Sequence, residues 1–519
     1  MVSATTKNVV LFPFPGQGHF GGFLSLAGML HRAAPDIAIT LVSTPGNVAG
    51  LRRRASSADD NSFIIFHELP FAPADYGLPA GCESSDAIPV SRIMDLLEAY
   101  EMLQPAFDEF VAGAAATAGS VVCVVSDPFM AWTVTVARRH GCTHSFFASC
   151  GAFGSAVVHS LWVWGHLPVR PDEAGRVHLP EYPEVVIDRS QLSSNALRMA
   201  TEGKDRGAAF FGRQIPLGYK TDAVLINTVE KFEPTGLAML RRTLKLPVLP
   251  IGPLLRASSG LTSPDTAADA ASIISFLDSH PPSSVLYISF GSQSSILAEH
   301  MTELAAALET TGRPFVWAVK PPEGHDIKGE FRAEWLPEGF EERVTTTKKG
   351  LLLHGWAPQV RILAHGSTGT FLSHCGWNSV LESITHSVPI IGWPLSGEQF
   401  YNAKMLDEEW GVCVEVARGN MEGAVVEKGK LVSVMHTVMG QTAKAVEMRR
   451  RVTEIKEIME AAWEEGGDGS PAKKTLDESP KEFGGIRKFL KESARLIPAV
   501  ENRQVPASGE TSLLISGRN

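Results

Sequence analysis

The chain has few cysteines and no long apolar run. Its six cysteines, spread over 519 residues, show no paired metal-ligand spacing, and their scarcity indicates a reduced, cytosolic compartment. No stretch approaches the roughly 18 uninterrupted apolar residues that a membrane-spanning helix needs. The short apolar stretch near the start ends in Pro and Gly without a small-residue cleavage site. It therefore predicts a buried first strand rather than a secretory signal.

A basic excess and the common metal motifs are missing as well. The formal net charge of −10 argues against a nucleic-acid partner, because binding to backbone phosphates normally needs a basic face. The basic run at 52–54 is most simply a solvated helix end. Neither Asp-x-Asp nor His-Glu-x-x-His occurs. We therefore expect no metal site.

The sequence does contain a repeated alternation of apolar, strand-like runs with longer helical patterns. The length and the 44% hydrophobic content favour two domains of about 200–250 residues. The predicted strands are 9–14, 37–42, 63–68, 121–126, 145–148 and 223–227, followed by 285–290, 315–319, 350–354, 370–374, 389–393 and 413–416. This alternation is typical of parallel strands joined by crossover helices. The predicted fold class is α/β, with two doubly wound, Rossmann-like domains facing across a cleft.

Composition suggests where these parts begin and end. We predict a first domain over 1–253, a surface linker over 254–271 rich in Ser, Thr, Ala and Asp, and a second domain over 272–484. A helical pattern returns in the final element at 485–498. The tail over 499–519 is predicted to be disordered.

Polar candidates follow the predicted strands of both domains. His19 and Asp127 follow strands of the first half, whereas Ser292, His374 and Glu398 follow or end strands of the second half. Ligands of open parallel sheets bind outside the carboxyl ends of the strands. These side chains are therefore expected to line one interdomain cleft.

The segment 356–399 is the most informative part of the chain. It reads WAPQVRILAHGSTGTFLSHCGWNSVLESITHSVPIIGWPLSGEQ. An apolar run at 370–374 predicts a buried strand, Gly376 a tight turn, and Asn378-Ser379 the start of a helix. The unpaired N–H groups and the positive dipole end of such a helix form a site for an anion, here most simply a phosphate.

This segment resembles the signature of plant family 1 glycosyltransferases, which transfer a sugar from a UDP-sugar to a small acceptor. The resemblance extends to Pro-Phe-Pro-Gly-Gln-Gly-His near the start and to Val-Leu-Tyr-Ile-Ser-Phe-Gly-Ser in the middle, and it fades beyond about residue 466. It implies the GT-B architecture, with a terminal helix that crosses back to the first domain. It also implies a soluble enzyme, expected to be a monomer, that needs a UDP-sugar donor but no cofactor or metal.

The resemblance assigns the catalytic base to His19 and its orienting acid to Asp127. An imidazole suits proton removal because its unperturbed pKa lies close to neutral pH. A carboxylate on the other ring nitrogen fixes the tautomer and stabilises the imidazolium. Taken alone, a histidine in a glycine-rich turn more often caps a helix or packs its ring in the core. The match of segment 356–399 to the family signature favours the catalytic role instead.

The remaining site residues are assigned to the donor. Trp356 would stack on uracil, Ala357 would read the base edge through its backbone, and Gln359 and Glu382 would reach the ribose. By family analogy the diphosphate is reached by His374, Asn378, Ser379 and Ser292. The sugar is assigned to Glu398 and Gln399, with Ser149 as an added contact. Gln399 together with Trp377 tends to accompany UDP-glucose, whereas His at the last place favours UDP-galactose.

The sequence departs from the family pattern at two places. His19 is followed by Phe-Gly-Gly, where relatives often have a Pro soon after the base, which could alter acceptor placement. Ser387 replaces the common Gly before Val-Pro, and this costs strain if the residue needs positive φ.

Parts of the sequence are also compatible with two other functions. A nucleotide-dependent oxidoreductase is suggested by the glycines at 16, 18 and 21, but no acidic residue ends the next strand near 42–44. A sugar-nucleotide-binding protein without turnover is disfavoured by the intact His19 and Asp127. The main prediction is an inverting, metal-independent glucosyltransferase.

The acceptor is the least defined ligand. It is expected to bind the first domain near Phe14, Phe129 and the segments 77–90, 147–164 and 192–211, which are apolar and loop-rich. Such a lining suits a small apolar acceptor with a hydroxyl, such as a flavonoid, another phenolic or a terpenoid.

Overall fold

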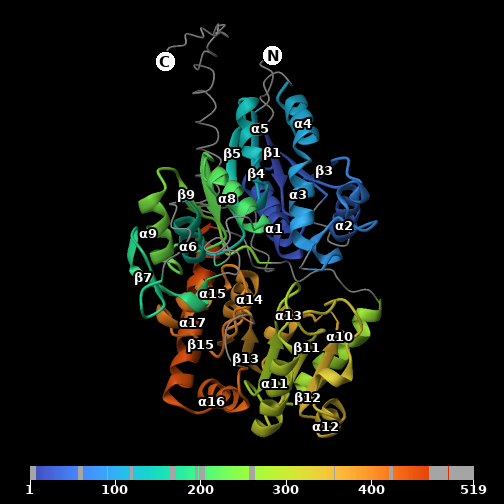
Figure 1. The fold of residues 1–519 in the computed structure, drawn as a ribbon, viewed down its shortest axis with the longest axis vertical. Helices are drawn as coiled ribbons and strands as arrows, with labels where there is room; N and C mark the ends of the chain where they lie inside the picture. The colour runs from blue at the N-terminus through green and yellow to red at the C-terminus, as the bar shows by residue number, and fades with distance from the viewer. Residues whose placement is uncertain are drawn as a thin grey trace, which may run out of the picture.

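The computed structural model describes residues 7–56, 62–89, 92–116, 121–163, 171–192, 197, 205–255, 264–355, 357–419, 425–466 and 489. The first and second halves of the chain each build a parallel sheet with helices packed around it, one domain above the other (Figure 1). The predicted fold class, two Rossmann-like α/β domains, is confirmed.

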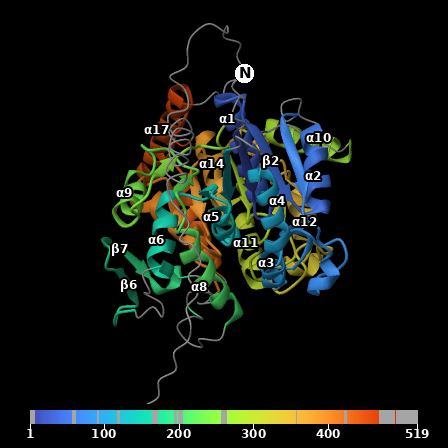
Figure 2. The same ribbon diagram turned by 90° about the horizontal axis from the view of Figure 1, so that it is seen from above.

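The first domain contains a sheet of seven parallel strands in the order β3-β2-β1-β4-β5-β8-β9. The strands are β1 Lys7–Phe12, β2 Ala38–Ser43, β3 Ile64–Glu68, β4 Val121–Ser126, β5 Thr143–Ala148, β8 Ala223–Ile226 and β9 Val248–Pro250. The helices are α1 Gln17–Ala33, α2 Pro45–Ser56, α3 Ile93–Glu101, α4 Gln104–Ala116, α5 Thr133–Arg139, α6 Ala152–Val163, α8 Arg206–Gly218 and α9 Pro234–Thr243. Seen from above, α6 and α9 lie at the opposite end of this domain from α2 (Figure 2).

Helices cover this sheet on both faces because successive residues of a strand point in opposite directions. Leu11 of β1 packs in one buried cluster with Phe23 of α1. The next residue, Phe12, stacks on Phe107 of α4 in another, with ring centroids 5.1 Å apart. Continuous apolar runs are therefore needed in these strands, as the sequence has them.

The second domain repeats the plan with six parallel strands in the order β12-β11-β10-β13-β14-β15. Its strands are β10 Val285–Ser289, β11 Phe315–Val319, β12 Gly350–His354, β13 Thr368–Ser373, β14 Ile390–Gly392 and β15 Cys413–Glu415. Its helices are α10 Pro264–Asp278, α11 Ala298–Thr311, α12 Phe340–Thr346, α13 Gln359–Leu363, α14 Trp377–Thr385, α15 Gln399–Glu408, α16 Lys428–Met439 and α17 Ala443–Gly466. Strand order reverses between β1 and β4 and between β10 and β13, which are the ligand-binding positions of doubly wound sheets.

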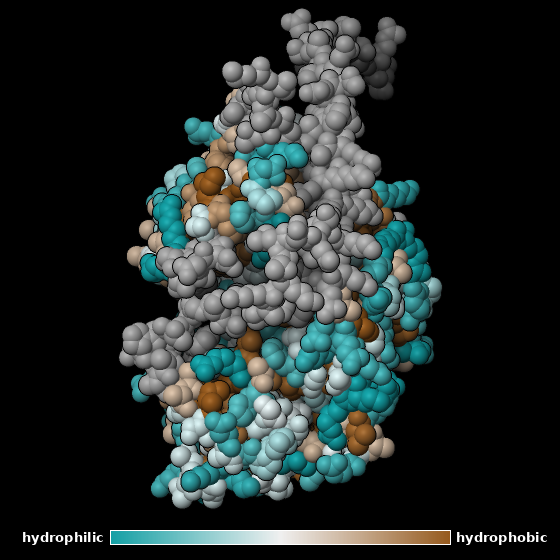
Figure 3. Space-filling view, turned by 180° about the vertical axis from the view of Figure 1, so that it is seen from behind, coloured by the Kyte–Doolittle hydropathy of each residue, from teal (hydrophilic) through white to brown (hydrophobic). Residues whose placement is uncertain are grey.

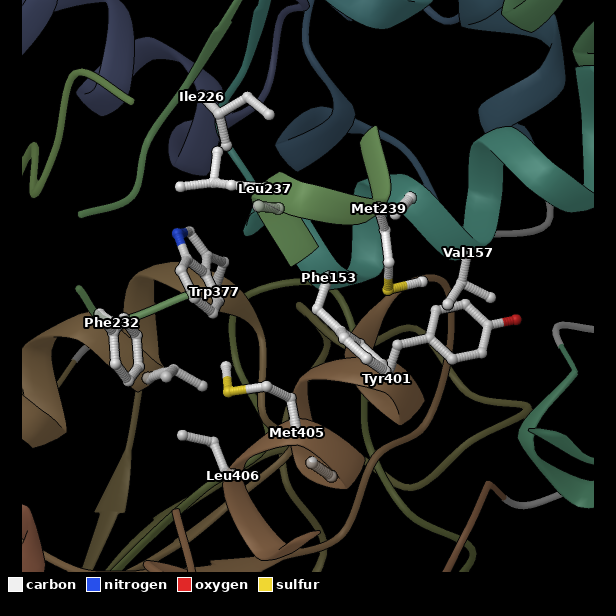
Figure 4. Packing of buried hydrophobic residues seen from close by; sticks show 14 of the residues in the cluster. Phe153, Val157, Ile226, Phe232, Leu237, Met239, Trp377, Tyr401, Met405 and Leu406 are labelled. Atoms are coloured by element: carbon white, nitrogen blue, oxygen red, sulfur yellow. The ribbon is translucent and has the colours of Figure 1, made fainter. Parts of the chain in front are cut away.

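A single buried cluster joins the two domains (Figure 4). Phe153 of α6 and Leu237 of α9 lie in this cluster with Trp377 of α14 and Tyr401 of α15, and α17 adds residues such as Val452. We call this cluster the interdomain joint. Because it is buried and apolar, it fixes how the two sheet edges face each other.

The predicted strands are confirmed, with ends displaced by at most two residues. The prediction missed β9, a strand of only three residues that ends in Pro250, and an antiparallel hairpin formed by β6 Arg176–Leu179 and β7 Tyr182–Asp188. The helix predicted to start at Asn378 starts one residue earlier, at Trp377, with Gly376 as its N-cap.

The predicted linker 254–271 was too long. Helix α10 already begins at Pro264, because proline suits the first helical turn and the alanines that follow favour helix. Helix α17 runs to Gly466, inside the second domain predicted over 272–484. Of the final element at 485–498 only Phe489 is described, 1% exposed in the core of the first domain. The rest of that element and the tail 499–519 lie outside the described residues.

The surface of the described chain is largely polar. On the face shown in Figure 3, hydrophilic residues dominate the second domain and hydrophobic ones occur singly or in small groups. Within the described residues, no helix has both the length and the apolar character needed to cross a bilayer.

Candidate active site

His19 and Asp127 lie side by side at the carboxyl edge of the first sheet. β1 and β4 are paired neighbours, with Phe12 opposite Ser126, so the residues that follow them meet at the reversal of strand order. His19 stands in the first turn of α1, and its Nδ1 atom lies 2.6 Å from Oδ2 of Asp127. The sequence-predicted pair is thus brought into direct contact.

The carboxylate of Asp127 is held from a second side. Its side chain is fully buried, and Oδ1 accepts a hydrogen bond from the backbone N–H of Phe129 at 3.1 Å. The side chain of His19 remains 26% exposed. A buried, fixed carboxylate on Nδ1 leaves Nε2 as the ring nitrogen that can exchange a proton with a ligand.

Aromatic rings surround this pair. Phe14 meets the His19 ring edge-on at 5.1 Å, and Phe129 lies 5.7 Å from the same ring. Farther out, Phe129 contacts Phe211, which contacts Trp162 of α6. These rings come from the segments predicted to bind an apolar acceptor, and they form an apolar wall beside the imidazole.

The second domain contributes a helix start that faces α1. The side-chain amide of Asn378, the second residue of α14, donates to the backbone oxygen of Gly18 at 3.2 Å. Gly18 directly precedes His19. The predicted anion-binding helix end and the predicted base are therefore joined across the cleft by one hydrogen bond.

The ring of His374 is wedged between two glycines. A Cβ atom on either Gly291 or Gly376 would lie 2.5 Å from its Nε2, so both positions require glycine. Burial, with a further contribution from the charge of Lys320, lowers the pKa of His374 to about 4. The imidazole is therefore neutral near pH 7. Cys375, which follows His374 and lies two residues before α14, has a left-handed φ of 61°.

Two predicted ribose ligands are hydrogen-bonded to each other. The amide nitrogen of Gln359 donates to Oε2 of Glu382 at 2.7 Å and to Oγ of Ser379 at 3.0 Å. Its amide oxygen accepts from the hydroxyl of Tyr287 at 3.2 Å. This network ties α13 to α14. Ala357 is half-buried beside it, whereas Trp356 lies outside the described residues.

The predicted sugar contacts lie around the start of α15. Burial raises the pKa of Glu398, and the charge of His19 opposes that rise. The side-chain oxygen of Gln399 accepts from the backbone N–H groups of Leu395 and Ser396, both at 3.0 Å. Ser149 lies beside Gly22 of α1.

Ser292 is exposed on the loop after β10. Among the described residues, no three His, Cys, Asp or Glu side chains gather closely enough to hold a metal ion.

Comparison with known proteins decides the family. Residues 226–441 match the family model for UDP-glucoronosyl and UDP-glucosyl transferase, and residues 6–178 match that for the glycosyltransferase N-terminal domain. UDP-glycosyltransferase 92A1 of Arabidopsis thaliana is 38% identical over 91% of this chain and 96% of its own length. The chain belongs to the plant UDP-glycosyltransferase family. Its activity is UDP-glycosyl transfer, which sets aside the oxidoreductase and binding-protein alternatives.

Two further relatives support this family assignment. Crocetin glucosyltransferase 3 of Crocus sativus is 38% identical over 81% of this chain and 89% of its own. Among solved structures, a Glycyrrhiza uralensis glycosyltransferase complexed with glycyrrhetinic acid 3-O-monoglucuronide superimposes with a TM-score of 0.76, at 25% identity over 96% of both chains. A Siraitia grosvenorii enzyme in complex with UDP gives a TM-score of 0.73, at 25% identity over 94% of this chain and all of its own.

In this UDP-glycosyltransferase the Trp377 side chain points away from the cleft. It is 3% exposed, its indole N–H donates to the backbone oxygen of Asn227 at 2.6 Å, and its ring stacks on Phe232. The sequence placed Trp377 among the donor-binding residues. Its indole instead belongs to the interdomain joint, so any contact with the donor is left to its backbone.

Sequence reasoning missed Glu233. This fully buried carboxylate accepts from the backbone N–H groups of Ala152 and Phe153, at 2.7 and 3.0 Å, and so caps the start of α6. Burial raises its pKa to about 7. Its partners lie some 80 positions earlier in the chain, so no local sequence signal announces the contact.

Sequence reasoning also missed Gln293 and Lys320. The Gln293 amide crosses the cleft and donates to Ser85 at 2.7 Å and to Asp86 at 3.0 Å. Lys320 directly follows β11 and donates to the backbone oxygen of Gly291. Gln293 lies in the loop after β10, and Lys320 directly follows the neighbouring strand β11. Ligands of parallel sheets bind at this carboxyl edge, so these positions were the sequence signal that could have identified both residues.

Proposed function

We propose that this UDP-glycosyltransferase transfers glucose from UDP-glucose to a hydroxyl group of a small apolar acceptor, with inversion and without a metal ion. The observation that carries the proposal is the hydrogen bond from Asn378 to Gly18. It puts the start of the donor helix against the start of the helix that bears the His19–Asp127 pair. A sugar bound between these two helix starts would contact both of them.

The pair supports general-base catalysis. Nε2 of His19 takes the proton of the acceptor hydroxyl, and Asp127 on Nδ1 stabilises the imidazolium that forms. The acceptor oxygen then bonds to the anomeric carbon as the bond from that carbon to the β-phosphate oxygen breaks. The bonding electron pair leaves with UDP. A single displacement of this kind converts the α-linked donor into a β-linked product.

Three features support the ligand choice. The start of α14 offers unpaired N–H groups to the diphosphate. Family resemblance assigns Glu398 and Gln399 to a sugar's vicinal hydroxyls, and on the same ground Gln399 favours glucose. The rings of Phe14 and Phe129 suit an apolar acceptor such as a flavonoid, another phenolic or a terpenoid.

The proposal is tested by incubating the enzyme with UDP-glucose and a panel of flavonoids, simple phenols and terpenoid alcohols, with and without EDTA. We expect UDP release matched by a glucoside whose anomeric proton coupling in NMR identifies the β linkage. Activity should be unchanged by EDTA. An α-linked product would contradict the single displacement, and activity lost in EDTA and restored by a metal would contradict metal independence.

A further inference from the structure

The leaving group of the proposed reaction needs positive charge. UDP-glucose carries two ionised phosphates, and breaking the bond to the sugar adds a further negative charge on the β-phosphate. Anions of this kind are stabilised by cations or by oriented dipoles. The start of α14 supplies a dipole worth about half an elementary charge, which is less than the charge to be balanced.

His374 cannot make up the difference. Its pKa of about 4 leaves the ring neutral near pH 7, so it can donate a hydrogen bond but contributes no net charge. The Lys320 ammonium is the charge that acts on His374, and it helps to keep that ring neutral. Lys320, a cation that the sequence did not single out, contacts the loop that carries Ser292 and lies against His374.

The placement of Lys320 fits this role. It follows β11, which pairs with β10, and its Nζ atom donates to the backbone oxygen of Gly291. Gly291 lies against His374 and directly precedes Ser292. Burial lowers the pKa of Lys320 to about 8, and the Asp86 carboxylate of the first domain opposes that shift. The ammonium is thus held at the backbone of Gly291, next to the predicted phosphate ligands His374 and Ser292.

We propose that Lys320 supplies the positive charge that neutralises the donor diphosphate and the departing UDP, and that the negative charge of Asp86 on the first domain competes with the diphosphate. Gln293 supports this arrangement, because its amide donates to Oδ1 of Asp86 at 3.0 Å and holds that carboxylate at the cleft. The inference rests on the proposed function, since it requires a nucleoside diphosphate in this cleft.

The test compares UDP with uridine, which lacks the phosphates, by calorimetric titration of the full chain. Lys320→Met should weaken UDP binding about 10–100-fold, the usual effect of removing a charged hydrogen-bond partner. Its affinity for uridine should stay within about threefold of the wild type. Lys349→Met, an exposed lysine just before β12 at the far edge of the sheet, serves as the control and should leave both affinities unchanged.

A second variant changes the affinity in the opposite direction. Asp86→Asn removes the competing charge but keeps an oxygen for Gln293, so UDP should bind several-fold more tightly while uridine binding stays unchanged. If Lys320→Met lowers the affinities for UDP and uridine equally, or lowers neither, the inference is overturned. If the wild type shows no preference for UDP over uridine, the proposed donor site itself fails. The two failures are therefore distinguishable.

Discussion

Ser387 adopts a backbone conformation that residues other than glycine rarely take. Its φ is 57°, in the turn that connects α14 to β14, and its N–H donates to Ile384 at 2.9 Å. The left-handed region costs an L-residue about 1–2 kcal/mol. The sequence had marked this position as one where a serine would be strained if φ were positive, and the structure meets that condition.

Replacing Ser387 with glycine should therefore stabilise the protein. The relief of strain exceeds the extra freedom that glycine gives the unfolded chain, which leaves a gain of about 0.5–1 kcal/mol. A higher melting temperature in thermal denaturation would show it. Ser387→Ala keeps a Cβ and should give no gain. Equal melting temperatures for wild type and Ser387→Gly would contradict the strain.

At the scale of elements, the start of α6 connects the acceptor side of the cleft to the donor helix. A Cβ atom on Gly151 would lie 2.7 Å from the Trp377 ring and 2.8 Å from Oε1 of Glu233. At Gly154 a Cβ would lie 3.1 Å from Cβ of Glu398. The start of α6 and the residue before it can approach α14 and α15 only because they carry glycines at these contacts.

Gly151→Ala should therefore push the start of α14 out of place. We expect a destabilisation of about 1–3 kcal/mol, as for overpacking of a core, together with weaker UDP binding. Gly113→Ala is the matched control, because Gly113 is an exposed residue of helix α4 and an added Cβ would meet no neighbouring atom within 4 Å. That variant should be stabilised by about 0.5–1 kcal/mol. Unchanged UDP affinity in Gly151→Ala would show that this contact does not position α14.

Elements with strong local patterns could be predicted from the sequence, and those set by distant contacts could not. The buried run before Gly376 predicted β13 and α14 to within two residues. The placement of His19 and Asp127 at one sheet edge followed from their positions after parallel strands, whereas their pairing as base and orienting acid came from the family resemblance. By contrast, Glu233 and Lys320 owe their roles to partners far away in the chain, and the Trp377 ring could not be assigned to the joint without knowing which domain packs against it.

At the scale of the whole molecule, the interdomain joint makes one folding unit of two domains. Its buried cluster includes Phe153 and Leu237 from the first domain and Tyr401 and Val452 from the second. Domains that share a continuous apolar core lose contacts on both sides when either unfolds. The interdomain joint therefore fixes the relative position of the two domains on one side of the cleft. Elsewhere the domains are linked by polar contacts, such as the hydrogen bond from Gln293 to Ser85.

Scanning calorimetry of the full chain should accordingly show one unfolding transition. UDP at 100 times its dissociation constant should stabilise the whole transition by about 2.7 kcal/mol. Two separate transitions, of which only one moves with UDP, would contradict the shared core.

The central claim is that His19, oriented by Asp127, acts as the base opposite a donor site in the second domain. The most direct measurement compares glucosyl transfer and UDP affinity in His19→Ala with those in His140→Ala. His140 also contacts an aspartate, Asp108, at 3.1 Å, but it stands after α5, at the opposite edge of the sheet. We predict that His19→Ala loses transfer on the order of 10²–10⁴-fold while UDP binding persists, and that His140→Ala changes neither. Transfer that survives in His19→Ala would contradict the account.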